Sequence, residues 1–185
     1  MSKNKPNTVI KSNFDYYQAI ASTEKKLVDP VIIISKRHDH VTRDKGEIPL
    51  KSTLPASLKL EVEASNISSQ DFKFKIFDRA LMPQPCYRFD SDGEAHNNLG
   101  DIPLQERQVT TPHFHKFNES GVEIAYKTAE LNKISASLDR KLGLSIFAAE
   151  ENISYDSIPD IRRDEELIPP ENVVTDPLQG EQFYE

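Results

Sequence analysis

Two neighbouring segments alternate strictly between apolar and charged side chains, and this feature constrains the fold most. Residues 58–64 read Leu-Lys-Leu-Glu-Val-Glu-Ala, and residues 72–77 read Phe-Lys-Phe-Lys-Ile-Phe, with a polar turn between them. A period of two places alternate side chains on opposite faces of a strand. The pattern therefore predicts a β-hairpin.

Other segments predict further strands and two helices. The additional strands are expected at residues 31–35, 86–89, 114–117 and 122–126. Apolar residues recur at helical spacing over residues 13–28 and again from 129 to about 150. Residues 36–56 follow neither period and are expected to form a surface loop. The predicted fold class is α+β, with a single antiparallel meander sheet and with N-terminal and C-terminal helices packed on one face.

Charge is spread unevenly along the chain. The whole sequence of 185 residues carries a formal charge of −7, whereas residues 151–185 alone hold ten acidic residues and two arginines. This acidic segment has too many prolines for a continuous helix and too few apolar residues for a core of its own. We therefore expect a flexible N-terminus at 1–12, a single α+β domain at 13–150 and an acidic, proline-containing extended tail at 151–185.

The composition also bears on location and partners. The longest apolar run has strand length, so no membrane contact is expected, and the polar N-terminus does not resemble a secretory signal. A single cysteine, Cys86, allows no internal disulfide. These features predict a cytoplasmic protein. The tail at 151–185, with its scattered apolar residues, is expected to bind a protein partner or to fold back over the domain.

Three of the five histidines lie within twenty residues of one another. If residues 86–89 and 114–117 belong to strands, Arg88 and Asp90 share one face, and His113 and His115 also share a face. A sheet can then bring these four side chains together, with His96 in an adjoining loop within reach. This stretch is where we expect any chemistry to reside.

Acid–base catalysis is the first chemical interpretation. A neutral histidine, His113 or His115, can take a proton from a ribose 2′-hydroxyl, while His96 donates one to the leaving oxygen. Arg88 would stabilise the phosphate charge and Asp90 would orient a histidine, without any metal cofactor.

Metal binding is the second interpretation. A divalent transition metal can be held by His96, His113 and His115, with Asp90 or Glu119 as a further ligand. The spacing His-x-His-x3-Glu is a partial match to the first cupin motif, although the preceding glycine and the second motif are absent. A third interpretation is structural, with an ordinary arginine–aspartate ion pair and histidines that hold loops.

The order Arg-x-Asp, His and Pro-His-x-His resembles a mostly uncharacterised family of small prokaryotic proteins. It is similar to the TumE-type toxin of toxin–antitoxin pairs. The matching residues are Arg88, Asp90, His96, Pro112, His113 and His115. The resemblance implies a compact α+β domain, and an RNA-directed toxin or a protein of a mobile-element or defence locus.

Two functional hypotheses follow. The first is a toxin-like endoribonuclease that acts on RNA phosphodiesters through the His/Arg/Asp residues. The chain has no basic stripe interleaved with aromatic residues, so affinity for RNA has to come from a local patch. The alternative is a non-enzymatic binding protein of a defence or mobile-element assembly, which docks through its acidic C-terminal tail.

Overall fold

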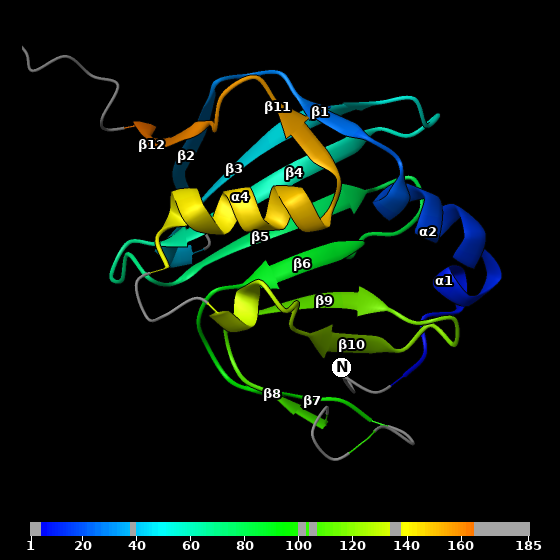
Figure 1. The fold of residues 1–185 in the computed structure, drawn as a ribbon. Helices are drawn as coiled ribbons and strands as arrows, with labels where there is room; N and C mark the ends of the chain where they lie inside the picture. The colour runs from blue at the N-terminus through cyan, green and yellow to red at the C-terminus, as the bar shows by residue number, and fades with distance from the viewer. Residues whose placement is uncertain (1–4, 38–39, 100–102, 104–106, 134–137, 165–185) are drawn as a thin grey trace, which may run out of the picture.

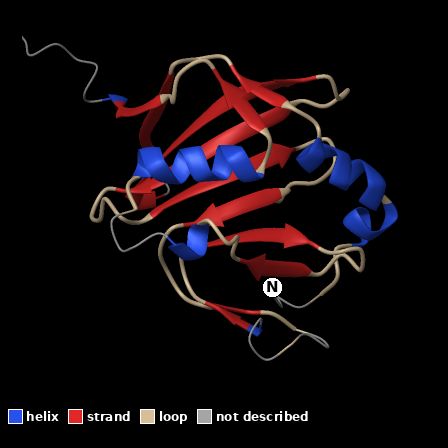
Figure 2. Ribbon diagram, viewed as in Figure 1, coloured by secondary structure: helices blue, strands red, loops and turns tan. Residues whose placement is uncertain are grey.

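A computed structural model describes residues 5–37, 40–99, 103, 107–133 and 138–164. Over these residues the fold is mixed α+β, with three α-helices and a ten-stranded sheet (Figures 1 and 2). None of the helices in this part of the chain is long and apolar enough to cross a membrane. The predicted fold class is thus confirmed at the level of α+β.

The large sheet contains most of the strands. They are β1 (Lys25–Leu27), β2 (Val31–Arg37), β3 (His40–Ser52), β4 (Leu58–Ser65), β5 (Phe72–Asp78), β6 (Tyr87–Asp90), β9 (His113–Phe117), β10 (Glu123–Tyr126), β11 (Ile153–Tyr155) and β12 (Asp160–Arg163). A separate two-stranded sheet pairs β7 (His96–Asn97) with β8 (Gln108–Val109). The helical elements are α1 (Thr8–Ser12), α2 (Phe14–Ser22), the 3₁₀ helix η1 (Leu131–Lys133) and α4 (Arg140–Glu150).

The sheet is not the single antiparallel meander that we expected. Its order is β10-β9-β6-β5-β4-β3-β1-β11, and every neighbouring pair from β10 to β1 is antiparallel. β11 joins β1 in parallel, and β12 joins β2 in parallel. That prediction was wrong because the parallel strands come from the far end of the chain, and local alternation carries no information about such pairing.

Residues 36–56 were wrongly expected to be a loop, because β3 crosses most of this segment. Some of its charged residues pair with the next strand: Lys45 Nζ lies 3.2 Å from Glu63 Oε2. Others pair elsewhere, such as Asp44 with Arg163 of β12. A Cβ atom on Gly46 would lie only 2.0 Å from the carbonyl oxygen of Ile33, so glycine permits the close approach of β2. This strand is stabilised by ion pairs and by the close approach at Gly46, and it lacks the apolar alternation from which a strand is predicted.

Both predicted helices are shorter than expected. The first ends at Ser22, and the chain then turns into β1. The second was expected over residues 129–150, but η1 occupies only Leu131–Lys133 and residues 134–137 lie outside the described part. Helix α4 starts after Asp139, whose side chain accepts a hydrogen bond of 2.7 Å from the Leu142 amide. The N-cap interrupts a periodicity that had suggested one continuous helix.

Folded structure extends past both expected domain limits. Helix α1 lies within the segment that we expected to be flexible, and its Ile10 side chain is fully buried. At the other end, β11 and β12 place residues 153–155 and 160–163 of the expected tail in the sheet. Residues 165–185 of that tail lie outside the described residues.

One face of the sheet is apolar and carries the core. Phe74 pairs across the strands with Val62 on one side and Phe89 on the other, so all three point to the same face. Helix α4 lies across this face (Figure 1), where the rings of Phe74 and Phe147 are 5.8 Å apart. Helix α2 covers the same face near β6, since the Tyr17 ring stacks on Tyr87 at 4.8 Å.

The opposite face carries the charged members of the alternation. Lys75 Nζ lies 2.9 Å from Glu61 Oε1 and 2.5 Å from Glu63 Oε2, and both glutamates are buried. Lys73, two residues before Lys75, belongs to the same face. The strict alternation of the hairpin therefore separates an apolar core from a densely paired polar surface.

Glu151, directly after α4, supports a pH-dependent prediction. Its side chain is almost fully buried, and burial raises the pKa of this carboxyl from 4.5 to about 8. A raised pKa in the folded state stabilises the fold below pH 4.5, and this contribution is lost as pH rises through 8. We expect Glu151→Gln to increase the free energy of unfolding at pH 7 by about 1–3 kcal/mol, and to have little effect at pH 4.

Urea unfolding at the two pH values, followed by circular dichroism, measures this difference. Glu130→Gln is the matched control because Glu130 is exposed. An equal gain at pH 4 and pH 7 would show that the effect does not come from ionisation of Glu151.

Candidate functional site

Strands β6 and β9 bring four of the five sequence-predicted residues together on the polar face. Arg88 lies opposite His115 in the register, and Asp90 lies opposite His113. Alternation directs each pair to the same side of its strand, and antiparallel pairing sets the two strands side by side. The apolar residues between them, Phe89 and Phe114, point into the core. We call Arg88, Asp90, His113 and His115 the histidine cluster.

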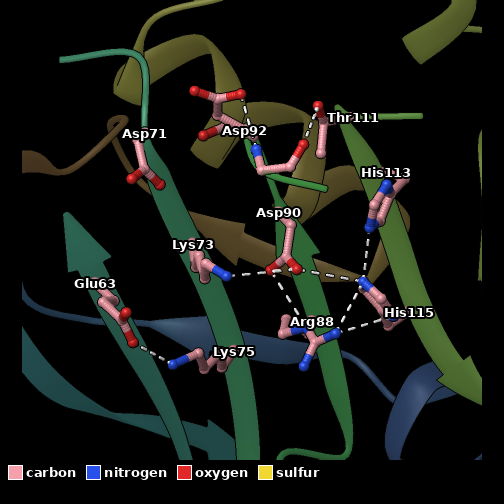
Figure 3. Close-up of polar contacts among 12 residues, drawn as sticks. Glu63, Asp71, Lys73, Lys75, Arg88, Asp90, Asp92, Thr111, His113 and His115 are labelled. Carbon is pink, nitrogen blue, oxygen red and sulfur yellow. Dashed lines mark hydrogen bonds and ion pairs between the residues drawn. The ribbon is translucent and has the colours of Figure 1, made fainter. Parts of the chain in front are cut away.

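His115 is the centre of this cluster (Figure 3). Its Nε2 atom lies 2.8 Å from Nε2 of His113 and 3.3 Å from Oδ2 of Asp90. Arg88 Nη2 lies 2.9 Å from the same His115 nitrogen. One ring nitrogen therefore faces another histidine, a carboxylate and a guanidinium at once.

Further charged groups surround the cluster. Arg88 Nε lies 3.2 Å from Asp90 Oδ1, and Lys73 Nζ lies 3.6 Å from Asp90 Oδ2. Glu123 on β10 places Oε1 at 3.6 Å from both His115 Nδ1 and Arg88 Nη2. Asp90 is thus flanked by two cations, and His115 lies between two carboxylates.

Burial strengthens these electrostatic effects. Asp90, His113 and His115 are 7%, 1% and 3% exposed. Burial alone would raise the pKa of Asp90, but the interactions with His115, Arg88 and Lys73 outweigh it and hold the pKa well below its ordinary range. Burial, together with the neighbouring His115, lowers the pKa of His113 to about 4. At neutral pH Asp90 is therefore ionised and His113 is neutral.

His96 reaches the cluster from the two-stranded sheet. Its ring centroid lies 4.9 Å from that of His115 and 6.4 Å from that of His113. The neighbouring Asn98 fixes this segment, because its amide makes two 2.8 Å hydrogen bonds to the backbone of Ala125 at the edge of the large sheet. All five sequence-predicted residues therefore surround one volume.

That volume is a pocket of about 780 Å³ on the polar face. Besides the predicted residues, its lining includes Lys73, Glu94 and Glu123. Sequence analysis did not select these three. Lys73 was already placed in the hairpin by its alternation, and Glu123 follows His115 after one turn, but only the strand order shows that both lie beside the cluster.

The structure also changes the candidate metal ligands. Asp90, His113 and His115 each present a ligand atom within 4.8 Å of the other two, which is close enough for a metal site. The sequence had suggested His96 as the third ligand beside His113 and His115. In the structure Asp90, and not His96, completes this convergent group of three. Glu119, which had also been considered, is exposed and lines a different pocket.

Comparison of the chain with protein-family models, with curated proteins and with solved structures gave no match.

Proposed function

We propose that the pocket is the active site of an endoribonuclease that cleaves RNA phosphodiester bonds. The observation that supports this most directly is the placement of His115 between the Asp90 carboxylate and the Arg88 guanidinium, on the wall of an open pocket. A polarised imidazole next to a fixed cation suits proton transfer at a phosphate ester. The resemblance to TumE-type toxins points to the same class of activity.

The proposed reaction uses each part of the pocket. The 2′-oxygen of a ribose attacks the adjacent phosphorus while the bond from phosphorus to the 5′-oxygen breaks. One of the two histidines of the cluster, His113 or His115, takes up the 2′-hydroxyl proton. His96 supplies a proton to the leaving 5′-oxygen. Arg88 and Lys73 bind the phosphate oxygens. The products are a 2′,3′-cyclic phosphate and a 5′-hydroxyl end.

An RNA-cleavage assay with the full chain tests the proposal. His96→Ala removes the partly exposed acid and His115→Ala removes the centre of the cluster. Each is expected to lower the cleavage rate by about 10²–10⁴-fold, the usual contribution of a general acid or base. Arg162→Ala is the control, because this half-exposed arginine pairs with Asp160 on β12, at an edge of the sheet away from the pocket.

Substrate chemistry gives a second control. An oligonucleotide with a single 2′-deoxyribose at the cleaved position should resist cleavage, because the proposed nucleophile is absent. Absence of cleavage by the unmodified chain, or equal cleavage by the His96→Ala and His115→Ala variants, would exclude the proposed activity.

The alternative remains a non-enzymatic binding protein. The mutual contacts of the histidine cluster favour it, since ion pairs and ring contacts of this kind also stabilise a sheet face without any reaction. Docking through the acidic tail would then depend on residues 165–185, because β11 and β12 already belong to the sheet. Partner binding that is lost on deletion of residues 165–185, without RNA cleavage by the full chain, would support this alternative.

A further inference from the structure

We infer that Asp90, His113 and His115 bind one divalent transition-metal ion, and that Glu123 orients His115 for this purpose. The inference goes beyond the proposed function and does not depend on it, because metal binding can be measured without RNA.

The three ligand atoms lie within 4.8 Å of one another, and two of the three distances match the geometry of one ion. Metal–nitrogen and metal–oxygen bonds of about 2.0–2.2 Å separate two ligand atoms by about 2.9 Å at a right angle and about 3.4 Å at a tetrahedral angle. His113 Nε2 and His115 Nε2 are 2.8 Å apart, and Asp90 Oδ2 is 3.3 Å from His115 Nε2. All three residues are buried, and all three line the pocket.

The second nitrogen of His115 supports the same assignment. A histidine that binds a metal through Nε2 carries its proton on Nδ1, and that proton is commonly directed at a carboxylate. Arg88 Nη2 lies 3.1 Å from His115 Nδ1, and Glu123 Oε1, on the neighbouring strand β10, lies 3.6 Å from the same nitrogen. Once Arg88 has moved away from His115, Glu123 is the carboxylate beside this nitrogen, and we assign it as the positioning residue of the ring in the metal-bound form.

The charge balance of the pocket also favours a cation. Among the described residues, the pocket lining contains two cationic side chains, Lys73 and Arg88, against the three carboxylates of Asp90, Glu94 and Glu123. A divalent ion would change the net charge of this lining from negative to positive, which suits a phosphate ligand. When bound, such an ion would supply Lewis-acid stabilisation of charge on a phosphate, with Asp90, His113 and His115 as its ligands.

Arg88 provides the sharpest test, because it competes for the same nitrogen. Its Nη2 lies 2.9 Å from His115 Nε2, where the ion would bind. Metal binding therefore requires the guanidinium to move away, and Glu123, 3.6 Å from Nη2, is a partner for it. Removal of this cation should strengthen metal binding, whereas a purely structural cluster would show no such gain.

The mixed nitrogen and oxygen ligands indicate the class of ion. Imidazole suits zinc, iron, copper and nickel, whereas magnesium and calcium prefer ligand sets made entirely of oxygen. Three protein ligands leave at least one position open for water or substrate. We therefore use Zn²⁺ for the measurement.

Calorimetric titration of Zn²⁺ into chelator-treated full-length protein is the test. We expect one ion per chain, at least a tenfold loss of affinity for Asp90→Asn, and a loss of about 10–100-fold for Glu123→Gln. Arg88→Ala should gain affinity. Glu119→Gln is the matched control and should bind within about threefold of the unmodified chain, because Glu119 is exposed and lines a different pocket.

Absence of zinc binding by the unmodified chain, or unchanged affinity in both Asp90→Asn and Arg88→Ala, would overturn the inference. Circular dichroism of each variant checks that it is folded. RNA cleavage that persists after chelation, together with no zinc binding in the titration, would overturn the metal site and leave the proposed endoribonuclease standing. Zinc binding with the expected variant effects but without RNA cleavage would support the metal site and exclude the activity.

Discussion

Replacement of Phe74 by alanine is expected to lower the free energy of unfolding by about 3–5 kcal/mol. Phe74 is fully buried on β5, and its ring centroid lies 5.3 Å from that of Phe72, 6.1 Å from that of Phe89 and 5.8 Å from that of Phe147. Truncation would leave a cavity between the sheet and α4 at the centre of this aromatic group. The lost contacts and the cavity both destabilise the fold.

Urea denaturation, followed by circular dichroism, measures the loss. Ile67→Ala is the matched control because Ile67 is 79% exposed in the hairpin turn, and a change within about 0.5 kcal/mol is expected there. A loss below about 1 kcal/mol for Phe74→Ala would mean that α4 does not pack on this face as described.

The second large effect is expected from Asp90→Ala, which should lower the free energy of unfolding by about 2–4 kcal/mol. Removal of one partner from a buried ion pair leaves the other charges unpaired, which costs about 3–5 kcal/mol in fully enclosed pairs. Here the side chains of Arg88 and Lys73 are each 26% exposed, so water compensates part of that cost. Arg88 also keeps its contact with Glu123.

The same denaturation experiment applies to this variant at neutral pH and in the presence of chelator. Asp92→Ala is the control, because Asp92 lies two residues further along in an exposed turn. A loss for Asp90→Ala no larger than that for Asp92→Ala would show that the carboxylate is not needed to hold the charged side chains of the pocket.

These two predictions concern opposite faces of the same sheet. Phe74 on β5 packs against Phe147 of α4 and against Phe89 of β6, while Lys73 and Asp90, each one residue away, face the pocket. The rigid apolar face therefore fixes the backbone that positions the charged groups. A site built on strands rather than on loops can hold charged side chains close together at a fixed spacing.

The sequence alone determined the features that depend on local periodicity. The hairpin formed by β4 and β5 follows the predicted alternation over nearly its whole length. Alternation also assigned Arg88 and Asp90 to one face and His113 and His115 to one face. A period of two directs side chains regardless of what lies beside the strand, so these assignments needed no knowledge of the rest of the chain.

Only the tertiary structure decided which segments lie beside one another. β3 is held by charged partners on β4, and β11 and β12 join strands that precede them by more than a hundred residues. Asp90 in place of His96 as the third convergent ligand, and Glu123 beside His115, follow from the order β10-β9-β6. Such pairings depend on how the whole chain excludes water from one core, and a local pattern of residues cannot specify that.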